Sequence, residues 1–400
     1  MNRPPLKAKS RRRGFTLIEL LVVVVIIATL IALLVPAIAS AVRAARNASV
    51  QAEINQMAQA LADFKTKYGD YPPSRVILAE NGRIPSVAVS NISGGLDPTG
   101  KIPTDISGLQ LANRTVNAMR KFWPRAPFTI GGVLDGTSTL DPGFGKLWFD
   151  FNGNGVAEIT ASATPLYLQG HECLVFFLGG IPLTINNGQI SVIGFDKNPI
   201  NPFTNGLINS GAMYSANRNP PFFPFDGGRL NYTNGSSSQI PGYLDSLRSQ
   251  PAKQNFYAYF STNNGSGYDP NDMNVKNDAD FDNTGTQVAL QFCAPLAIPA
   301  QTGQSQRTLS FSPNPYTTGS TVPSLSLNQT PAYINAQSYQ IISPGTDGGY
   351  GTGGIYAAIS SNGSPELTST PQNSLTNSND AGIRTIERDN LTNFHNGKLE

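Results

Sequence analysis

Side chains able to do chemistry are sparse in this chain of 400 residues, and the most organised set is an oxygen-rich loop. Asp150, Asn152 and Asn154 alternate along the chain and Gly155 follows them, which is how a calcium-binding loop begins. Carboxylate and amide oxygens are the ligands that Ca²⁺ takes, and glycine permits the sharp turn. A complete loop of this type has a carboxylate at its twelfth position, which is Ala161 here, so a plain Asn/Gly turn stays the alternative.

Two cysteines, Cys173 and Cys293, are a candidate disulfide pair. Such a bridge forms in an oxidising compartment. Both residues lie in apolar runs, so two buried free thiols are the alternative, and the sequence does not supply the geometry that would decide.

The chain contains few residues suited to acid–base catalysis. The chain has two histidines, His171 and His395, and neither belongs to the paired-histidine motif of a zinc protease helix. The formal net charge is +2 and 14% of the residues are charged, which gives no basic surface for nucleic acid. We therefore expect neither an enzyme nor a nucleic-acid partner.

The N-terminal forty residues form the most distinctive element. Basic residues between Lys7 and Arg13 precede a long apolar run, and Glu19 stands almost at the beginning of that run. Leu20 to Ala39 matches the roughly 20 residues needed to span a bilayer. Because cations favour the cytoplasmic side, the N-terminus is expected in the cytoplasm and the rest of the chain outside it.

Three interpretations of this element are open. A signal peptide would be cleaved near Ala39-Ser40-Ala41, but its apolar core spans only about 7–15 residues. A plain membrane anchor fits the length, but it gives no reason for Glu19, since an acid at the centre of a bilayer costs roughly 2.5–3.5 kcal/mol.

The third interpretation rests on the stretch from Gly14 through Phe15 to Glu19, which resembles the prepilin peptidase recognition motif of type IV pilins and type II secretion pseudopilins. The resemblance implies cleavage between Gly14 and Phe15 and methylation of Phe15 as the new N-terminus. Glu19 then becomes the fifth mature residue and Pro36 the twenty-second, where that family has an assembly glutamate and a helix-bending proline.

In the family, the α-amine of the first mature residue lies close to the glutamate of a neighbouring subunit. An ion pair in an apolar environment offsets the desolvation of each charge, so Glu19 is expected to set the stacking register. The implied partners are other pseudopilin subunits, the prepilin peptidase/methyltransferase, the inner-membrane assembly platform and membrane lipid. The implied location is the inner membrane, single-pass, with a cytoplasmic N-terminus and a periplasmic or extracellular head.

The remaining elements suggest an α+β fold, with a long N-terminal transmembrane helix packed on a mainly antiparallel β-sheet head with long loops. Apolar residues from Ile54 to Tyr68 recur at spacings of three and four, and Gly69 and Pro72 end the helix. Strands are predicted at 173–180, 183–195, 255–262, 286–293 and 338–343. The expected division is a leader at 1–14, a transmembrane helix at 15–39, its continuation at 40–71 and the head at 72–400.

A second calcium candidate comes from the same resemblance. Ser343-Pro-Gly-Thr-Asp347-Gly is similar to the S-x-G-x-D-G stretch of the major pseudopilin, which contributes to a calcium loop there, and Asp389 stands in the terminal piece of that loop. Arg388 occupies the place of a further aspartate, so this chain offers one carboxylate fewer toward the about 6–8 oxygens that calcium takes.

The sequence as a whole predicts a pseudopilin-like structural subunit of a type II secretion or type IV pilus-like filament. The enlarged head resembles those of long-headed pseudopilin-like proteins in planctomycete-type bacteria. The alternative is a binding or adhesion module that a pilin-type helix displays on a filament or membrane.

Overall fold

The computed structural model describes one long helix and a head of short elements. The residues that it describes are 16–85, 108–131, 148–155, 165–184, 189–204, 217–232, 240–247, 255–262, 265, 267–268, 272–273, 315–317, 333–350, 354–357, 366–367 and 387–399.

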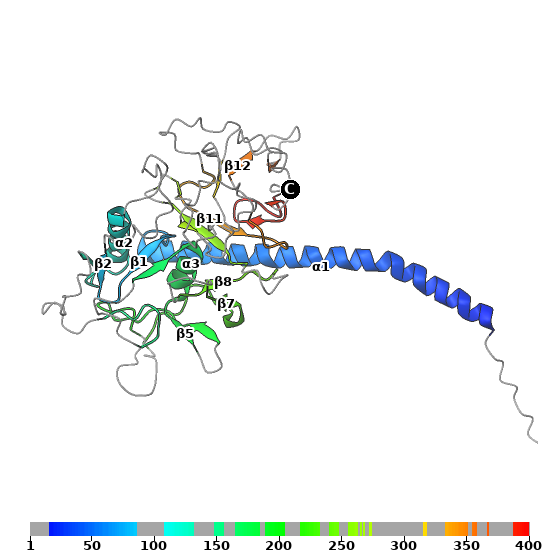
Figure 1. Cartoon of the computed structure of the whole chain (residues 1–400), viewed down its shortest axis with the longest axis horizontal. Coiled ribbons are helices and arrows are strands. Elements are labelled where there is room, and N and C mark those ends of the chain that lie inside the picture. The colour runs from blue at the N-terminus through cyan, green and yellow to red at the C-terminus, as the bar shows by residue number, and fades with distance from the viewer. Residues whose placement is uncertain are drawn as a thin grey trace, which may run out of the picture. The chain divides into compact units, whose positions relative to one another are not determined.

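Helix α1 (Leu17–Tyr68) is the dominant element (Figure 1). Its C-terminal end lies where the sequence predicts, because Gly69 adopts a positive φ of 82° and donates its N–H to the carbonyl oxygen of Lys65 at 2.7 Å. Pro36, the predicted helix-bending proline, lies inside α1, and the helix continues through it without a break.

The chain divides into two compact units, Met1–Arg46 and Asn47–Glu400. In the second unit, the predicted apolar stripe of α1 is confirmed, since Ile54, Met57, Leu61 and Phe64 are fully buried. The Phe64 ring lies 5.1 Å from the ring of Phe122, and other aromatic rings surround it. The second half of the helix is therefore part of the core of the head.

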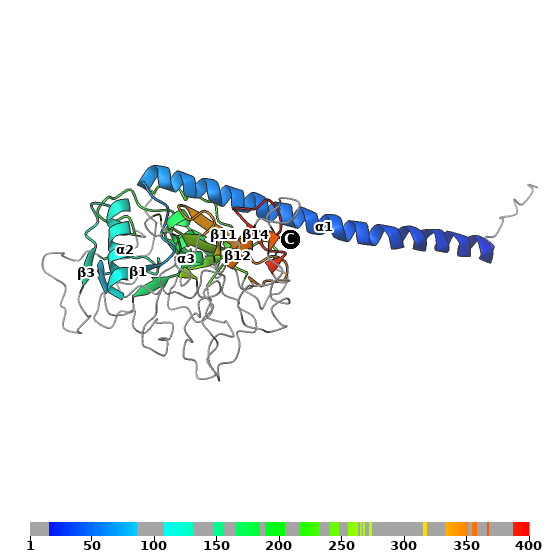
Figure 2. The same ribbon diagram turned by 90° about the horizontal axis from the view of Figure 1, so that it is seen from above.

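A three-stranded antiparallel sheet lies beside this part of α1 (Figure 2). Its order is β14 (Leu391–Thr392), β11 (Tyr339–Ser343) and β9 (Ala258–Ser261), with Ser343 opposite Leu391 and Tyr339 opposite Ser261. The side chain of Gln51 donates to the carbonyl oxygen of Thr392 at 3.2 Å, which joins the helix to the sheet. The strands predicted at 255–262 and 338–343 are confirmed.

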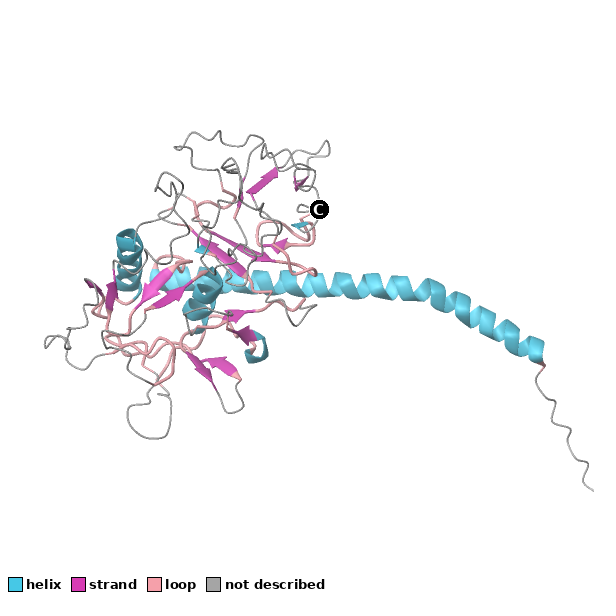
Figure 3. Cartoon of the chain, viewed as in Figure 1, coloured by secondary structure: helices cyan, strands magenta, loops and turns pink. Residues whose placement is uncertain are grey.

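The other strands are short and form small separate sheets (Figure 3). β1 (Val76–Leu78) pairs antiparallel with β4 (Leu166–Leu168), β5 (Pro182–Thr184) with β6 (Ile190–Val192), and β7 (Leu230–Asn231) with β8 (Gly242–Tyr243). β2 (Arg83–Pro85) pairs parallel with β3 (Thr129–Gly131). β10 (Tyr316–Thr317) pairs parallel with β12 (Gly354–Ala357), which pairs antiparallel with β13 (Glu366–Leu367). The fold is thus α+β and pilin-like in layout, and β5 and β6 confirm strand pairing within 183–195.

Two further helices are present, α2 (Gly108–Phe122) and α3 (Gly170–Gly179), with a 3₁₀ turn η2 (Gly227–Arg229). The strand predicted at 173–180 is wrong, because this segment belongs to α3 and all ten residues of that helix are buried. A continuous apolar run fits a buried strand and a buried helix equally well. Gln169 and Glu172 form a capping box that starts the helix. The strand predicted at 286–293 lies outside the described residues.

Candidate functional site

The first unit presents a continuous apolar surface. From Leu17 to Val42, the large apolar side chains of α1 are 44–81% exposed. By length and composition this helix could cross a membrane. Exposed apolar surface of this extent marks a membrane or protein interaction site.

The first turn of α1 holds its own carboxylate. The backbone N–H and the hydroxyl of Thr16 both donate to Oε2 of Glu19 at 2.8 Å, and the Glu19 N–H donates back to the Thr16 hydroxyl oxygen at 3.3 Å. This reciprocal arrangement is a capping box, which satisfies backbone donors at the helix start. Gly14 and Phe15 lie outside the described residues, so cleavage and methylation stay predictions.

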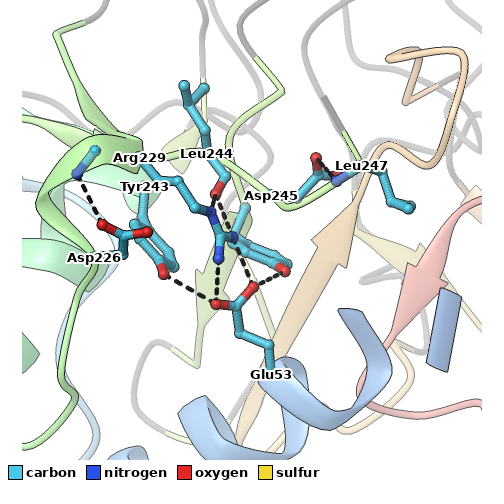
Figure 4. A network of polar contacts seen from close by, with 9 residues as sticks. Glu53, Asp226, Arg229, Tyr243, Leu244, Asp245 and Leu247 are labelled. Carbon is cyan, nitrogen blue, oxygen red and sulfur yellow. Dashed lines mark hydrogen bonds and ion pairs between the residues drawn. The ribbon is translucent and has the colours of Figure 1, made fainter. Parts of the chain in front are cut away.

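A polar cluster on the second half of α1 was not expected (Figure 4). Glu53 accepts two hydrogen bonds from the Arg229 guanidinium, at 2.6 and 2.7 Å, and further hydrogen bonds from the hydroxyls of Tyr243 and Tyr257. Arg229 also donates to the Leu244 carbonyl oxygen, and its guanidinium lies 4.3 Å from the centre of the Tyr243 ring. We call these four side chains, Glu53, Arg229, Tyr243 and Tyr257, the Glu53 cluster.

Burial gives the Glu53 cluster its electrostatic character. The Arg229 and Glu53 side chains are only 23% and 15% exposed. Burial, reinforced by the charge of Glu53, raises the pKa of Tyr257 well above its ordinary value and keeps the phenol a hydrogen-bond donor. The cluster therefore fixes α1 to the strand β8 and the turn η2 that precedes β7.

The residues of the second calcium candidate come together in one turn. The antiparallel pairing of β11 and β14 places Ser343 beside the segment that contains Asp389. The Thr346 and Asp347 N–H groups donate to Oδ2 of Asp389 at 2.6 and 3.2 Å. Gly345 has a φ of 67°, and a β-carbon there would lie 2.5 Å from the carbonyl oxygen of Asp389.

This turn fits a cation in part. Oδ1 of Asp389 is buried and has no hydrogen-bond partner among the described residues. The Ser343 hydroxyl, however, donates to Asp245 at 2.6 Å and accepts from Gly345. Asp347 and Asp389 are therefore the residues that would hold calcium, and Ser343 holds Asp245. Burial raises the pKa of Asp245 to about 7.

The remaining predicted residues are placed as follows. Asp150 and Asn152 are buried and Asn154 is exposed in the segment between β3 and β4. Cys173 is fully buried in α3, where burial raises the pKa of its thiol. Cys293 lies outside the described residues, so the disulfide stays a prediction.

Sequence reasoning missed two functional arrangements. The Thr16–Glu19 capping box has a local signal, since Thr followed three residues later by Glu is its usual pattern. The Glu53 cluster has none, because Glu53 and Arg229 are 176 residues apart and their contact depends on the tertiary fold.

Comparison with known proteins gives a match, which lies in the N-terminal segment. No curated protein and no solved structure matches the chain. Residues 9–35 match the family model described as the prokaryotic N-terminal methylation motif. That match contains Phe15, Glu19 and the greater part of the exposed apolar surface. Together with the long apolar helix, it shows that the chain carries the prepilin signal of the type IV pilins and pseudopilins.

Proposed function

We propose that this protein is a pseudopilin-like structural subunit of a type II secretion or type IV pilus-like filament. Prepilin peptidase cuts it between Gly14 and Phe15 on the cytoplasmic side of the inner membrane and methylates Phe15. Subunits leave the membrane and stack through α1, with the head on the periplasmic side. The observation that carries the proposal is the methylation motif at residues 9–35 at the head of a helix whose apolar side chains are exposed.

The first turn suggests how the carboxylate is handled before assembly. In the separate subunit, Glu19 is partnered by Thr16 of the same chain. In the filament, we propose that the α-amine of a neighbouring Phe15 lies beside Glu19 and forms an ion pair with it. Removing one partner of a buried ion pair costs several kcal/mol, because the remaining charge is left uncompensated. A stacking offset that leaves Glu19 unpaired is therefore disfavoured.

Two variants test this pairing in cells that express the natural assembly machinery. Glu19→Leu is expected to insert into the membrane and to be cut before Phe15. It is expected to be absent from the filaments that shearing releases from the cells. Thr16→Ala removes the side-chain cap, costing about 0.5–2 kcal/mol of helix stability, but keeps the acid and is expected to assemble. N-terminal sequencing checks the cleavage, and resistance to alkaline extraction checks the insertion.

The results separate the parts of the proposal. Normal filaments from Glu19→Leu would refute the pairing. If the protein isolated from its native cells still carries residues 1–14, the proposed cleavage is refuted. If the isolated protein is soluble and begins after Ala41, the N-terminal segment is a cleaved signal peptide instead.

We also propose that the turn at Asp347 and Asp389 binds calcium. The buried Oδ1 atom of Asp389, without a partner in the described part of the chain, supports this. A bound cation would supply positive charge to these two carboxylates and hold the ends of β11 and β14 together. The turn would then be a stabilising element of the head.

A further inference from the structure

The loop at Asp150 is held rigidly by the aromatic residues that alternate with its polar ones. Phe149 and Phe151 are buried in the core of the head. The Phe149 ring lies 4.8 Å from that of Phe128, and the Phe151 ring lies 4.7 Å from that of Phe203. Because neighbouring rings fix the backbone on both sides of Asp150, its carboxylate has a defined position.

The loop folds around side-chain oxygens. Oδ2 of Asp150 accepts the Gly155 N–H at 3.1 Å, and Oδ1 of Asn152 accepts the Asn154 N–H at 3.0 Å. Gly153 has a φ of 71°, and a β-carbon there would lie 1.9 Å from the carbonyl oxygen of Pro182. The glycine is therefore required for this conformation of the loop.

Two polar atoms in the loop are buried without a hydrogen-bond partner in the part of the chain that the structure describes. They are Oδ1 of Asp150 and Nδ2 of Asn152, and the two residues are only 1% and 6% exposed. Buried polar atoms are almost always satisfied, and an exception points to a bound water or ion. The loop thus contains a buried carboxylate oxygen that has no hydrogen-bond donor among the described residues.

The nearby cation does not supply that donor. The guanidinium of Arg218 donates to the carbonyl oxygens of Gly194 and Thr204.

We infer that this loop binds a divalent cation of the calcium class through Oδ1 of Asp150 and the side-chain oxygens of Asn152 and Asn154. An all-oxygen donor set favours calcium over transition metals, which prefer nitrogen and sulfur. Within the described residues, no three His, Cys, Asp or Glu side chains gather into a metal cluster, so amide oxygens and water complete the sphere. With one carboxylate, the dissociation constant is expected on the order of 10⁻⁴–10⁻³ M. This site is separate from the Asp389 turn and from filament assembly.

Terbium, which takes calcium sites and emits when a nearby tryptophan is excited, provides the test. Trp148 lies two residues before Asp150, and Trp123 contacts Phe203, which contacts Phe151. In the full-length processed protein in detergent micelles, tryptophan excitation is expected to give terbium emission that excess calcium displaces. Asp150→Asn should weaken terbium binding about tenfold or more, because the ligand charge is lost. Asp389→Asn, the matched control, should keep the emission.

A second variant distinguishes loss of cation binding from loss of folding. Asn154 is exposed, so Asn154→Ala should keep the native circular dichroism while weakening terbium and calcium binding. The inference is overturned if the wild type gives no emission. It is also overturned if folded Asp150→Asn and Asn154→Ala bind terbium as the wild type does.

Discussion

Replacing Glu53 with glutamine removes the charge that Arg229, Tyr243 and Tyr257 share while it preserves the shape of the side chain. Because the amide has one oxygen, it can accept from some of these donors, and its NH₂ group must then face the others. The Arg229 guanidinium keeps the Leu244 carbonyl oxygen as an acceptor but loses its counter-charge. The change therefore leaves a cation in the head with its main partner neutralised.

The size of the effect follows from exposure. The two charged side chains are 23% and 15% exposed, so the buried-pair range applies rather than the surface range. Breaking a buried pair by removing one partner costs about 3–5 kcal/mol. At about 2 °C per kcal/mol for a large domain, the midpoint of thermal unfolding should fall by about 6–10 °C.

The assay is thermal unfolding of the full-length processed protein in detergent, followed by near-ultraviolet circular dichroism, which reports on the packed aromatic core. The matched control is the exposed pair of Asp70 and Lys121, 2.8 Å apart and 50% and 48% exposed. Asp70→Asn should cost less than about 1 kcal/mol. A second change, Arg229→Gln, made in the Glu53→Gln background should cost less than it does alone, because the two side chains interact.

The reasoning would be refuted by a Glu53→Gln protein that unfolds within about 2 °C of the wild type, since that matches the surface range. It would equally fail if the Asp70→Asn protein lost as much stability as the Glu53→Gln protein. Additive effects of the Glu53 and Arg229 substitutions would show that the pair does not act as a unit.

Three further outcomes are expected. Asp245 has a pKa of about 7 in the folded state against an ordinary 3.8, so the folded state holds its proton more tightly and stability falls as pH rises from about 4 to about 7. In urea titrations at several pH values, Asp245→Asn should remove this decrease in the free energy of unfolding. Burial lowers the pKa of His171 to about 3, so its contribution still makes stability rise with pH below about 6.5. Calcium at ten times its dissociation constant from the Asp389 turn should add about 1.4 kcal/mol of stability, and Asp389→Asn should reduce the calcium-dependent rise in unfolding midpoint. Cys173 is fully buried, so a thiol reagent should leave it unlabelled in the folded protein by mass spectrometry. Its labelling on unfolding without reductant would contradict the predicted bridge to Cys293.

Features with local causes were predictable from the sequence. Gly69 and Pro72 end α1 because one adopts a positive φ and the other cannot continue a helix. The stripe that includes Ile54 and Phe64 predicted which face of α1 is buried. The prepilin signal was recognisable because its residues lie within a few turns of one another.

Features that depend on the tertiary fold were not predictable. Helix α3 was predicted as a strand because its apolar run has no polar positions to reveal a period. Asp245 and Ser343 are 98 residues apart, and no local pattern relates them. The Asp150 loop was visible as a motif, but only the structure shows that one carboxylate oxygen is buried without a partner in the described part of the chain.

The Glu53 cluster has a consequence for many copies packed side by side. Between Leu20 and Ala62, Glu53 is the only acidic residue, and Arg229 already neutralises it. Arg43 and Arg46 stay on the exposed surface of the same helix. A bundle of these helices would thus accumulate positive charge along its shaft and repel itself. If the subunits stack as proposed, acids on neighbouring heads or counterions must screen that repulsion, so filament growth should depend on ionic strength.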